Sequence, residues 1–240
     1  MLRRAAAAAL SSALLALACA GPAQAIRWKW PSLPKLPKLE GPTVAEAYGF
    51  DGGLTSLGLQ LGAALPTGAN GFSGAVAGGP AARLQLMRYL SSWIGVGVEA
   101  GIARFNRRNQ SGGPVGPMAV PGATAETLRA QAATIDAVGR VNVFEQGSWT
   151  PYALGGGGLS YFSATGSASV PGAAPTALKG YTRGFHVTAA AGLELFLIRG
   201  MSASFEARYD QYPLDSRRFT ETSAESLSYL VGLKVWYGGR

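Results

Sequence analysis

The single histidine of the chain, His186, lies near residue types that support nucleophilic hydrolysis. Thr188 supplies a hydroxyl group two residues further on, and Glu194 supplies a carboxylate eight residues further on. Such hydrolysis requires a base within reach of the hydroxyl and a third group that orients the base. In an extended segment, however, His186 and Thr188 both point to the same face, which we expect to be the interior one. We therefore predict that His186 is a hydrogen-bonded interior residue and that the chain is not an enzyme, with hydrolysis as the weaker alternative.

Metal and cofactor chemistry has little support in the sequence. One cysteine and one histidine exclude a Cys-rich or multi-His metal site. The glycine run 155–158 lacks the Lys-Ser/Thr pair of a phosphate-binding loop, and no HExxH motif occurs. We expect no catalytic residue, no metal site and no cofactor.

Charged residues make up only 14% of the chain, and several of them recur on one face of segments with period-two alternation. Buried charges must be paired, because removing a lone charge from water is costly. Four acids and four bases share this face, and we expect them to form a salt-bridge network that fills the interior. A gated narrow pore, in which one pair moves aside, is the alternative. The eight residues are Arg83, Glu99, Asp136, Arg140, Glu194, Glu206, Arg208 and Lys234.

The elements that carry these charges read as β-strands. In residues 57–65, LGLQLGAAL, leucine and alanine occupy every odd position, and glycine, glutamine or alanine occupies every even one. This alternation of 180° per residue is typical of a strand with two different faces. Five further segments repeat it, and two weaker ones, near 80–88 and 149–162, bring the number to eight. The five are residues 94–103, 133–143, 185–195, 201–209 and 225–237.

The connections predict how the strands are arranged. Short connections near 88–92, 145–148 and 197–200 alternate with long ones near 66–79, 106–126, 163–180 and 210–222. Short turns at one end and long loops at the other are typical of an up-and-down membrane barrel. We therefore predict an all-β fold over residues 53–240, an eight-stranded antiparallel up-and-down transmembrane β-barrel. A soluble exported β-sandwich or lipocalin-like barrel is the alternative, and it would bury the leucine face.

Aromatic residues cluster at the predicted strand ends. Their amphipathic rings are favoured at the level of the lipid headgroups. A second aromatic group falls near the long loops and comprises Phe105, Tyr161, Phe162, Tyr181, Tyr209 and Tyr212. We predict a girdle at the short-turn end made of Tyr89, Trp93, Phe144, Trp149, Trp236 and Tyr237.

Over residues 53–237 the chain resembles small outer-membrane β-barrels of Gram-negative bacteria, of the OmpA-like and OmpX-like kind. The resemblance is one of pattern, seen in residues 150–158 and 204–209, which look like strand segments of that family. Gly232, Val235 and Tyr237 look like its C-terminal assembly signal, although Leu230 stands where the signal prefers a polar residue. The resemblance implies an outer-membrane location and insertion by the barrel-assembly machinery. Some outer-membrane barrels are lipid A deacylases, and this is the activity that His186 would imply.

The N-terminal residues predict export. Residues 1–25 read as a cleaved signal peptide, with a basic start, an apolar stretch and a small-residue cleavage site. Cys19 is removed with this segment, or alternatively becomes a lipidated N-terminus. Residues 26–52 read as a periplasmic arm rich in proline and lysine, which favours an extended path. Within it, residues 26–46 read as a disordered tether, and the alternative is a docking segment for a periplasmic protein.

The net charge of +8 has a local origin. The basic residues in or beside the long loops could pair with the phosphates of lipopolysaccharide and outer-membrane lipid. We do not expect nucleic acid binding. The expected role is structural or interactive at the cell envelope, through the loops or through the N-terminal arm, with a porin-like channel as the alternative. The basic residues are Arg104, Arg107, Arg108, Arg129, Lys179, Arg183, Arg217 and Arg218.

Overall fold

Eight long strands account for most of the described chain, and they follow one another along the sequence. Between the first two lie a short helix, α3 (Gly71–Ala75), and a two-residue strand, β2 (Val76–Ala77). The computed structural model describes residues 53–67, 71–111, 125–143, 149–198, 200–215, 219 and 222–238. The long strands are β1 (Leu54–Thr67), β3 (Gly79–Tyr89), β4 (Ile94–Ser111), β5 (Ala125–Asn142), β6 (Trp149–Ser169), β7 (Thr176–Ile198), β8 (Met201–Pro213) and β9 (Ser223–Gly238).

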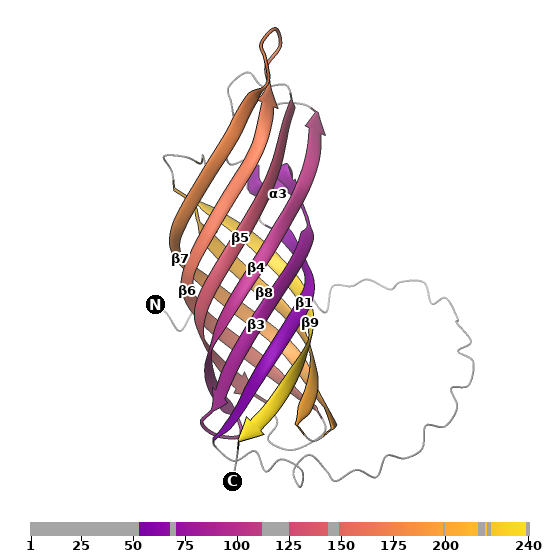
Figure 1. The fold of residues 1–240 in the computed structure, drawn as a ribbon, viewed down its shortest axis with the longest axis vertical. Coiled ribbons are helices and arrows are strands. Elements are labelled where there is room, and N and C mark those ends of the chain that lie inside the picture. Colours follow the sequence, from indigo (N-terminus) through magenta and orange to yellow (C-terminus); the bar gives the residue numbers. More distant parts are fainter. Residues whose placement is uncertain are drawn as a thin grey trace, which may run out of the picture. The chain divides into compact units, whose positions relative to one another are not determined.

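These strands form a closed antiparallel barrel (Figure 1). Each long strand pairs with its neighbour in the chain, and β1 pairs with β9 to close the sheet. The closing register runs from Leu54 opposite Gly238 to Thr67 opposite Glu225. The predicted eight-stranded, antiparallel, up-and-down barrel is confirmed. Among the described residues, no helix is long and apolar enough to cross a membrane.

The predicted long connection at 163–180 is wrong. Strands β6 and β7 continue as a regular hairpin, with Ala168 opposite Thr176, so only residues 170–175 connect them. This stretch is rich in serine, alanine, threonine and glycine, so it lacks an apolar face that could indicate a strand. Backbone hydrogen bonds to the neighbouring strand define it instead. Strands β4 and β5 likewise extend into the predicted loop at 106–126.

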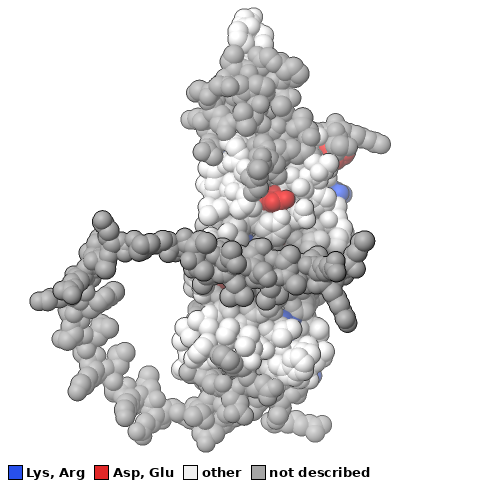
Figure 2. Space-filling view, turned by 180° about the vertical axis from the view of Figure 1, so that it is seen from behind, with Lys and Arg blue, Asp and Glu red and all other residues white. Residues whose placement is uncertain are grey.

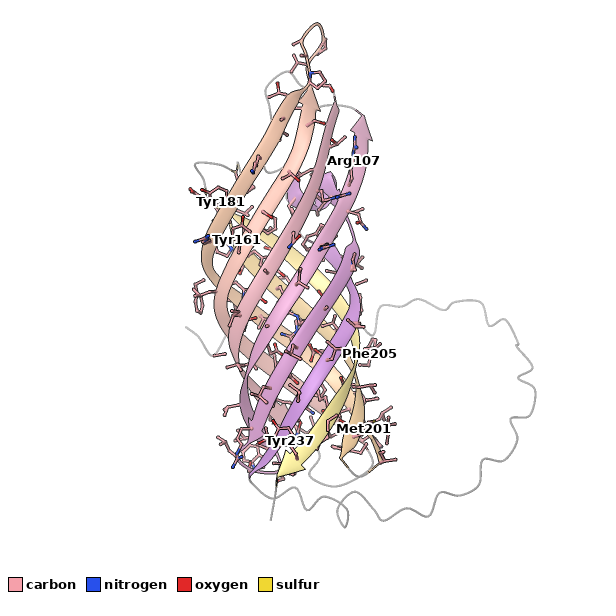
Figure 3. All side chains as sticks on the ribbon, viewed as in Figure 1. Arg107, Tyr161, Tyr181, Met201, Phe205 and Tyr237 are labelled. Atoms are coloured by element: carbon pink, nitrogen blue, oxygen red, sulfur yellow. The ribbon has the colours of Figure 1, made fainter. Side chains whose placement is uncertain are left out.

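The outer face of the barrel wall is apolar. On β9, Val231, Leu233 and Val235 are half or more exposed, and each alternates with a buried residue. Figure 3 shows Phe205 and Tyr237 pointing away from the barrel. On the described part of the face in Figure 2, charged atoms are sparse. Arg88 faces outward at the short-turn end of β3, and the other outward charged side chains of the described strands lie in the long-loop half of their strands: Arg104, Arg107, Arg129, Lys179, Arg183 and Glu225.

Two apolar clusters close the interior, one at each end. At the short-turn end, Tyr89 and Trp236 pack against one another with ring centroids 4.9 Å apart. At the long-loop end, Phe72 of α3 enters the barrel mouth and meets Phe105 edge-on, at 5.1 Å between centroids. Phe219, from the connection between β8 and β9, is buried in the same cluster. Residues outside the long strands therefore help to fill the mouth.

These clusters correct the predicted aromatic girdle. Trp93, Trp149 and Tyr237 are 48%, 45% and 50% exposed, as a girdle requires, and Phe144 lies outside the described residues. The placement of Tyr89 and Trp236 in the girdle is wrong, because both are buried inside the barrel. Neighbouring residues of a strand point to opposite faces, so Trp236 and Tyr237 cannot both face outward. The same rule places three members of the second aromatic group inside, namely Phe105, Phe162 and Tyr212.

Candidate functional site in the barrel interior

The structure places all eight predicted charges inside the barrel wall, where each is at most 4% exposed. They come from six different strands and lie between the two apolar clusters. Asp210 and His186 are fully buried among them. Asp210 was missed because the predicted segment ended at Tyr209, although Asp210 continues the inward positions of Glu206 and Arg208. The ionisable side chains form three groups. Some polar neighbours contact two of them, as Tyr152 contacts both Arg140 and Glu206.

The first group surrounds Glu194. Its Oε2 atom lies 2.5 Å from Nη1 of Arg140 and 3.2 Å from Nζ of Lys234. The hydroxyl of Ser202 donates a hydrogen bond to its other oxygen. The Arg140 guanidinium also stacks over the ring of Tyr152, with Cζ 3.7 Å from the ring centroid. One carboxylate therefore compensates two cations, and an aromatic face shields the larger of them.

The second group surrounds Arg208. Its guanidinium makes two hydrogen bonds to Glu99, of 2.6 and 2.9 Å, and its Nε donates to Oε1 of Glu206 at 2.7 Å. The amide of Gln85 donates to Glu99 at 2.5 Å, and the hydroxyl of Tyr152 donates to Glu206 at 2.8 Å. Two acids share one arginine here, and a neutral donor adds a hydrogen bond to each carboxylate. Such donors are what a buried ion pair needs to offset its desolvation.

The third group contains Arg83, His186 and two aspartates. Nη2 of Arg83 lies 2.6 Å from Oδ2 of Asp210, and Nη1 lies 3.7 Å from Oδ2 of Asp136. His186 fits between the same carboxylates, with Nδ1 2.8 Å from Asp136 and Nε2 3.3 Å from Asp210. Its ring stacks on Tyr212, with centroids 5.3 Å apart and planes inclined by 7°. Both imidazole nitrogens therefore face carboxylate oxygens.

The structure does not assemble the residues considered for hydrolysis. Glu194 binds Arg140 and Lys234, at a different level from His186. The Thr188 hydroxyl accepts a hydrogen bond from Arg208 at 3.2 Å and lies 3.4 Å from the carbonyl oxygen of Tyr209. Within the described chain, the hydrogen bonds and ion pairs of His186 go to Asp136 and Asp210 and not to Thr188 or Glu194. The arrangement suits charge compensation inside the wall, and it does not supply a base beside a nucleophile.

The described part of the chain also holds no group of three or more His, Cys, Asp or Glu side chains with metal-binding geometry. In each of the three groups above, the carboxylates are in contact with arginine, lysine or histidine. The interior therefore presents cations of the protein itself where a metal ion would have to bind.

The residues of the C-terminal assembly signal lie on β9. Val235 and Tyr237 are each 50% exposed on the outer face. Gly232 lies opposite Gln60 of β1, and a Cβ there would approach Cγ of Gln60 to 2.6 Å. Leu230, where the signal prefers a polar residue, is fully buried in the interior cluster at the long-loop end. Its apolar character thus matches its neighbours inside this barrel.

The basic residues assigned to the long loops lie on the outer side. Arg104, Arg107, Arg129, Lys179 and Arg183 are exposed at the long-loop end of their strands. The side chains of Arg108, Arg217 and Arg218 lie outside the described residues, as do the signal peptide and the arm at 26–52.

Comparison with known proteins finds similarity of fold alone. No protein-family model matches the chain, and no curated protein sequence matches it significantly. The crystal structure of Ail, the attachment invasion locus protein of Yersinia pestis, is 11% identical and covers 78% of this chain and 99% of its own, with a TM-score of 0.44. Neisserial surface protein A is 14% identical and covers 76% and 96%, with a TM-score of 0.44. The outer membrane protease OmpT of Escherichia coli is 9% identical and covers 78% and 94%, with a TM-score of 0.38.

Proposed function

We propose that this chain is a non-enzymatic β-barrel of the Gram-negative outer membrane, closed by paired charges and serving a structural or interaction role at the cell envelope. One observation carries the proposal: the closed wall turns its apolar side chains outward, and its charges point inward or, apart from Arg88, lie on the outer face in the long-loop half of the strands. A water-soluble barrel would have the opposite polarity, because exposed apolar surface is costly in water.

The dimensions of the wall support a membrane position. The outward residues of β9 run from Leu227 to Tyr237, a stretch of eleven residues. A tilted transmembrane strand needs about 9–11 residues to cross the hydrocarbon layer. Closure through β1 and β9 also leaves no open sheet edge along this stretch, and a bilayer tolerates no unpaired backbone groups.

The interior supports a structural role. Besides His186, nine buried charged side chains form three ion-paired groups in the lumen, and apolar clusters cover them at both ends. Eight-stranded barrels have interiors just wide enough for side chains to fill. We therefore expect partners to bind the outside of the molecule. A periplasmic protein is the proposed partner of residues 26–46, and outer-membrane lipid and lipopolysaccharide are the proposed partners of the rest of the outer surface. Export by the predicted signal peptide and insertion by the barrel-assembly machinery belong to the same proposal.

The proposal is tested first by envelope fractionation and gel mobility. We expect the chain in the outer-membrane fraction, with an unheated band that migrates differently from the heated one. A soluble periplasmic band without a heat shift would overturn it. Pull-down with and without residues 26–46 then tests the arm, and loss of a captured protein only in the deletion is the expected result.

A narrow-pore channel is the second candidate. It is favoured by buried polar atoms that have no hydrogen-bond partner among the described residues, such as Oε1 of Gln60, Oγ1 of Thr134 and Oγ of Ser204. Such atoms would line a hydrated path. The channel predicts a single-channel conductance that changes in Arg140→Gln and in Glu206→Gln, and silent bilayers for all three proteins would count against it.

A further inference from the structure

A cation lies directly beside an apolar row on the outer wall, near the long-loop end. Tyr161 of β6 is opposite Arg183 of β7 in the strand register. Two residues closer to the short-turn end, Ile135, Leu159 and Phe185 lie opposite one another on β5, β6 and β7. They are 68%, 71% and 67% exposed, which makes them the three most exposed large apolar side chains of the described residues.

A tyrosine ring lies beside the cation, and a second tyrosine stacks on the first. The Cζ atom of Arg183 lies 5.6 Å from the ring centroid of Tyr161. Tyr161 in turn stacks on Tyr181, with centroids 6.3 Å apart and planes inclined by 28°. Both tyrosines are on the outside of the barrel in Figure 3, and each is about two-fifths exposed. The rings thus hold the guanidinium at the outer surface, where tyrosine is favoured at headgroup level.

Arg183 has no anionic partner in the described chain. Each ion pair of the described residues involves interior groups, and Arg183 is in none of them. Arg183 shares this with the other outward cations of the described strands, and it lies directly beside the most exposed apolar row. Its guanidinium is therefore available to an anion from outside the protein.

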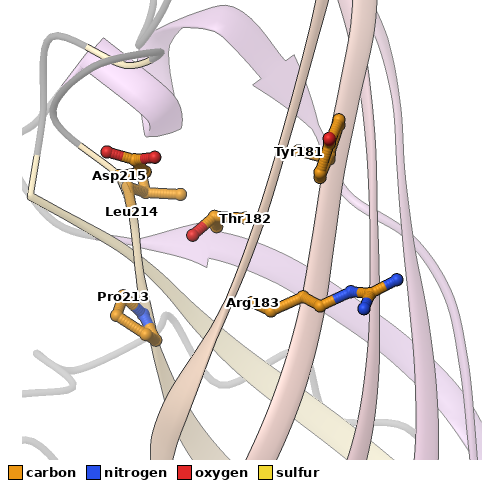
Figure 4. A pocket seen from close by; sticks show the side chains of 6 residues that line it. All are labelled: Tyr181, Thr182, Arg183, Pro213, Leu214 and Asp215. Atoms are coloured by element: carbon orange, nitrogen blue, oxygen red, sulfur yellow. The ribbon is translucent and has the colours of Figure 1, made fainter.

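The surface around Arg183 is hollowed on both sides. A groove of about 450 Å³ is lined by Ile135, Leu159, Tyr161 and Arg183 together with their neighbours. A second groove, of about 500 Å³, is lined by Tyr181, Thr182 and Arg183 of β7 and by Pro213, Leu214 and Asp215 (Figure 4). Arg183 lines both grooves, and its guanidinium points away from Pro213 and Asp215.

Strand pairing explains the second groove. The β7–β8 ladder begins at Val187 opposite Gln211, so the preceding residues of β7 pair only with β6. Pro213 ends β8 at this seam and has no N–H to donate. It packs against Gly184, where a Cβ would approach Cγ of Pro213 to 2.5 Å. The wall therefore opens beside Arg183.

We propose that the depression around Arg183 binds the phosphate group of a lipid from the surrounding membrane, with its acyl chain along Ile135, Leu159 and Phe185. The forked donors of a guanidinium match the oxygens of a phosphate. The cation and the apolar row follow one another toward the barrel middle, which is the order of head and chain in a membrane lipid. The inference rests on the proposed membrane location and adds a defined lipid site to it.

The test uses the full-length protein in a neutral detergent and lipid A as the probe, with bound lipid counted by native mass spectrometry. We expect wild type to bind lipid A and Arg183→Gln to bind about tenfold more weakly, since a charge-assisted contact is lost. Arg88→Gln is the matched control, because Arg88 is an outward arginine at the opposite strand end whose side chain bonds Thr55 at 3.2 Å. Its affinity for lipid A should equal that of wild type.

Two further probes identify the ligand chemistry. Dephosphorylated lipid A should bind wild type about as weakly as lipid A binds Arg183→Gln, and inorganic phosphate at equal concentration should not displace lipid A. Displacement by inorganic phosphate would overturn the lipid and leave an anion site. Equal binding by wild type and Arg183→Gln, or equal loss in both arginine variants, would overturn the site itself. A heat-modifiable outer-membrane band together with such a result would refute the lipid site and leave the membrane barrel standing.

Discussion

Arg208 on β8 binds Glu99 on β4 across the barrel, with Nη1 2.6 Å from Oε2 and Nη2 2.9 Å from Oε1. The two strands are four apart in the closed order, so they lie on opposite walls. Both side chains are almost completely buried. A two-point contact of this kind fixes the separation of the walls as well as the charge, and it makes Arg208 the centre of the interior network.

Arg208→Met should destabilise the barrel by about 3–5 kcal/mol, because it leaves Glu99 and Glu206 buried without their cation. The measurement is the free energy of unfolding in urea, in detergent or lipid vesicles. Arg88→Met, which removes an exposed arginine, should change it by less than about 1 kcal/mol. Adding Glu99→Gln and Glu206→Gln to Arg208→Met should recover part of the loss, and no recovery would contradict the role given to the charges.

Val231→Arg should destabilise the protein in vesicles by about 2–4 kcal/mol, since it places a charge near the middle of the apolar wall. Leu197→Arg, close to the short-turn end of β7, should cost about 0–1 kcal/mol, because the charge reaches the headgroups there. Both residues are more than half exposed, so neither change disturbs the interior. Equal and small effects at the two positions would indicate that water surrounds the wall.

Phe72→Ala should lower the free energy of unfolding by about 3 kcal/mol, because Phe72 is fully buried against Phe105 and Phe162. Leu90→Ala, in the short turn after β3, serves as the exposed control, with an expected change within about 0.5 kcal/mol. If both variants unfold like wild type, α3 does not contribute to the packed mouth of the barrel.

His186→Ala should leave the lipid composition of the membrane unchanged, because His186 faces Asp136 and Asp210 in the interior. The readout is the mass profile of lipid A from cells that express wild type, His186→Ala or no protein. Three identical profiles are expected. A change that appears with wild type and is lost in His186→Ala would establish the lipid-modifying enzyme instead.

The strands, their number and their outward faces could be predicted from the sequence, since period-two alternation is a local property of each segment. The inward side of Arg140 or Lys234 followed from the same parity. The same rule places Tyr89 and Trp236 inside the barrel. Their position at strand ends had favoured the outer girdle instead, and this was the wrong face. The hairpin beyond residue 163 was missed because polar and small residues carry no apolar pattern, while its pairing is made by the backbone.

For the segments with period-two alternation, the sequence by itself therefore determined that they form the wall and which side of it each residue occupies, because both depend on neighbours in the chain. The tertiary structure alone decided which charges meet. Closure between β1 and β9 brings Arg208 to Glu99 and sets His186 between Asp136 and Asp210, although these partners are 24 to 109 residues apart in the chain. It also decided that Phe72 and Phe219 enter the mouth, and that Arg183 is left beside the apolar row without an ion pair among the described residues. Those outcomes depend on the distance between opposite walls and on the order of strands around the barrel, which no local pattern encodes.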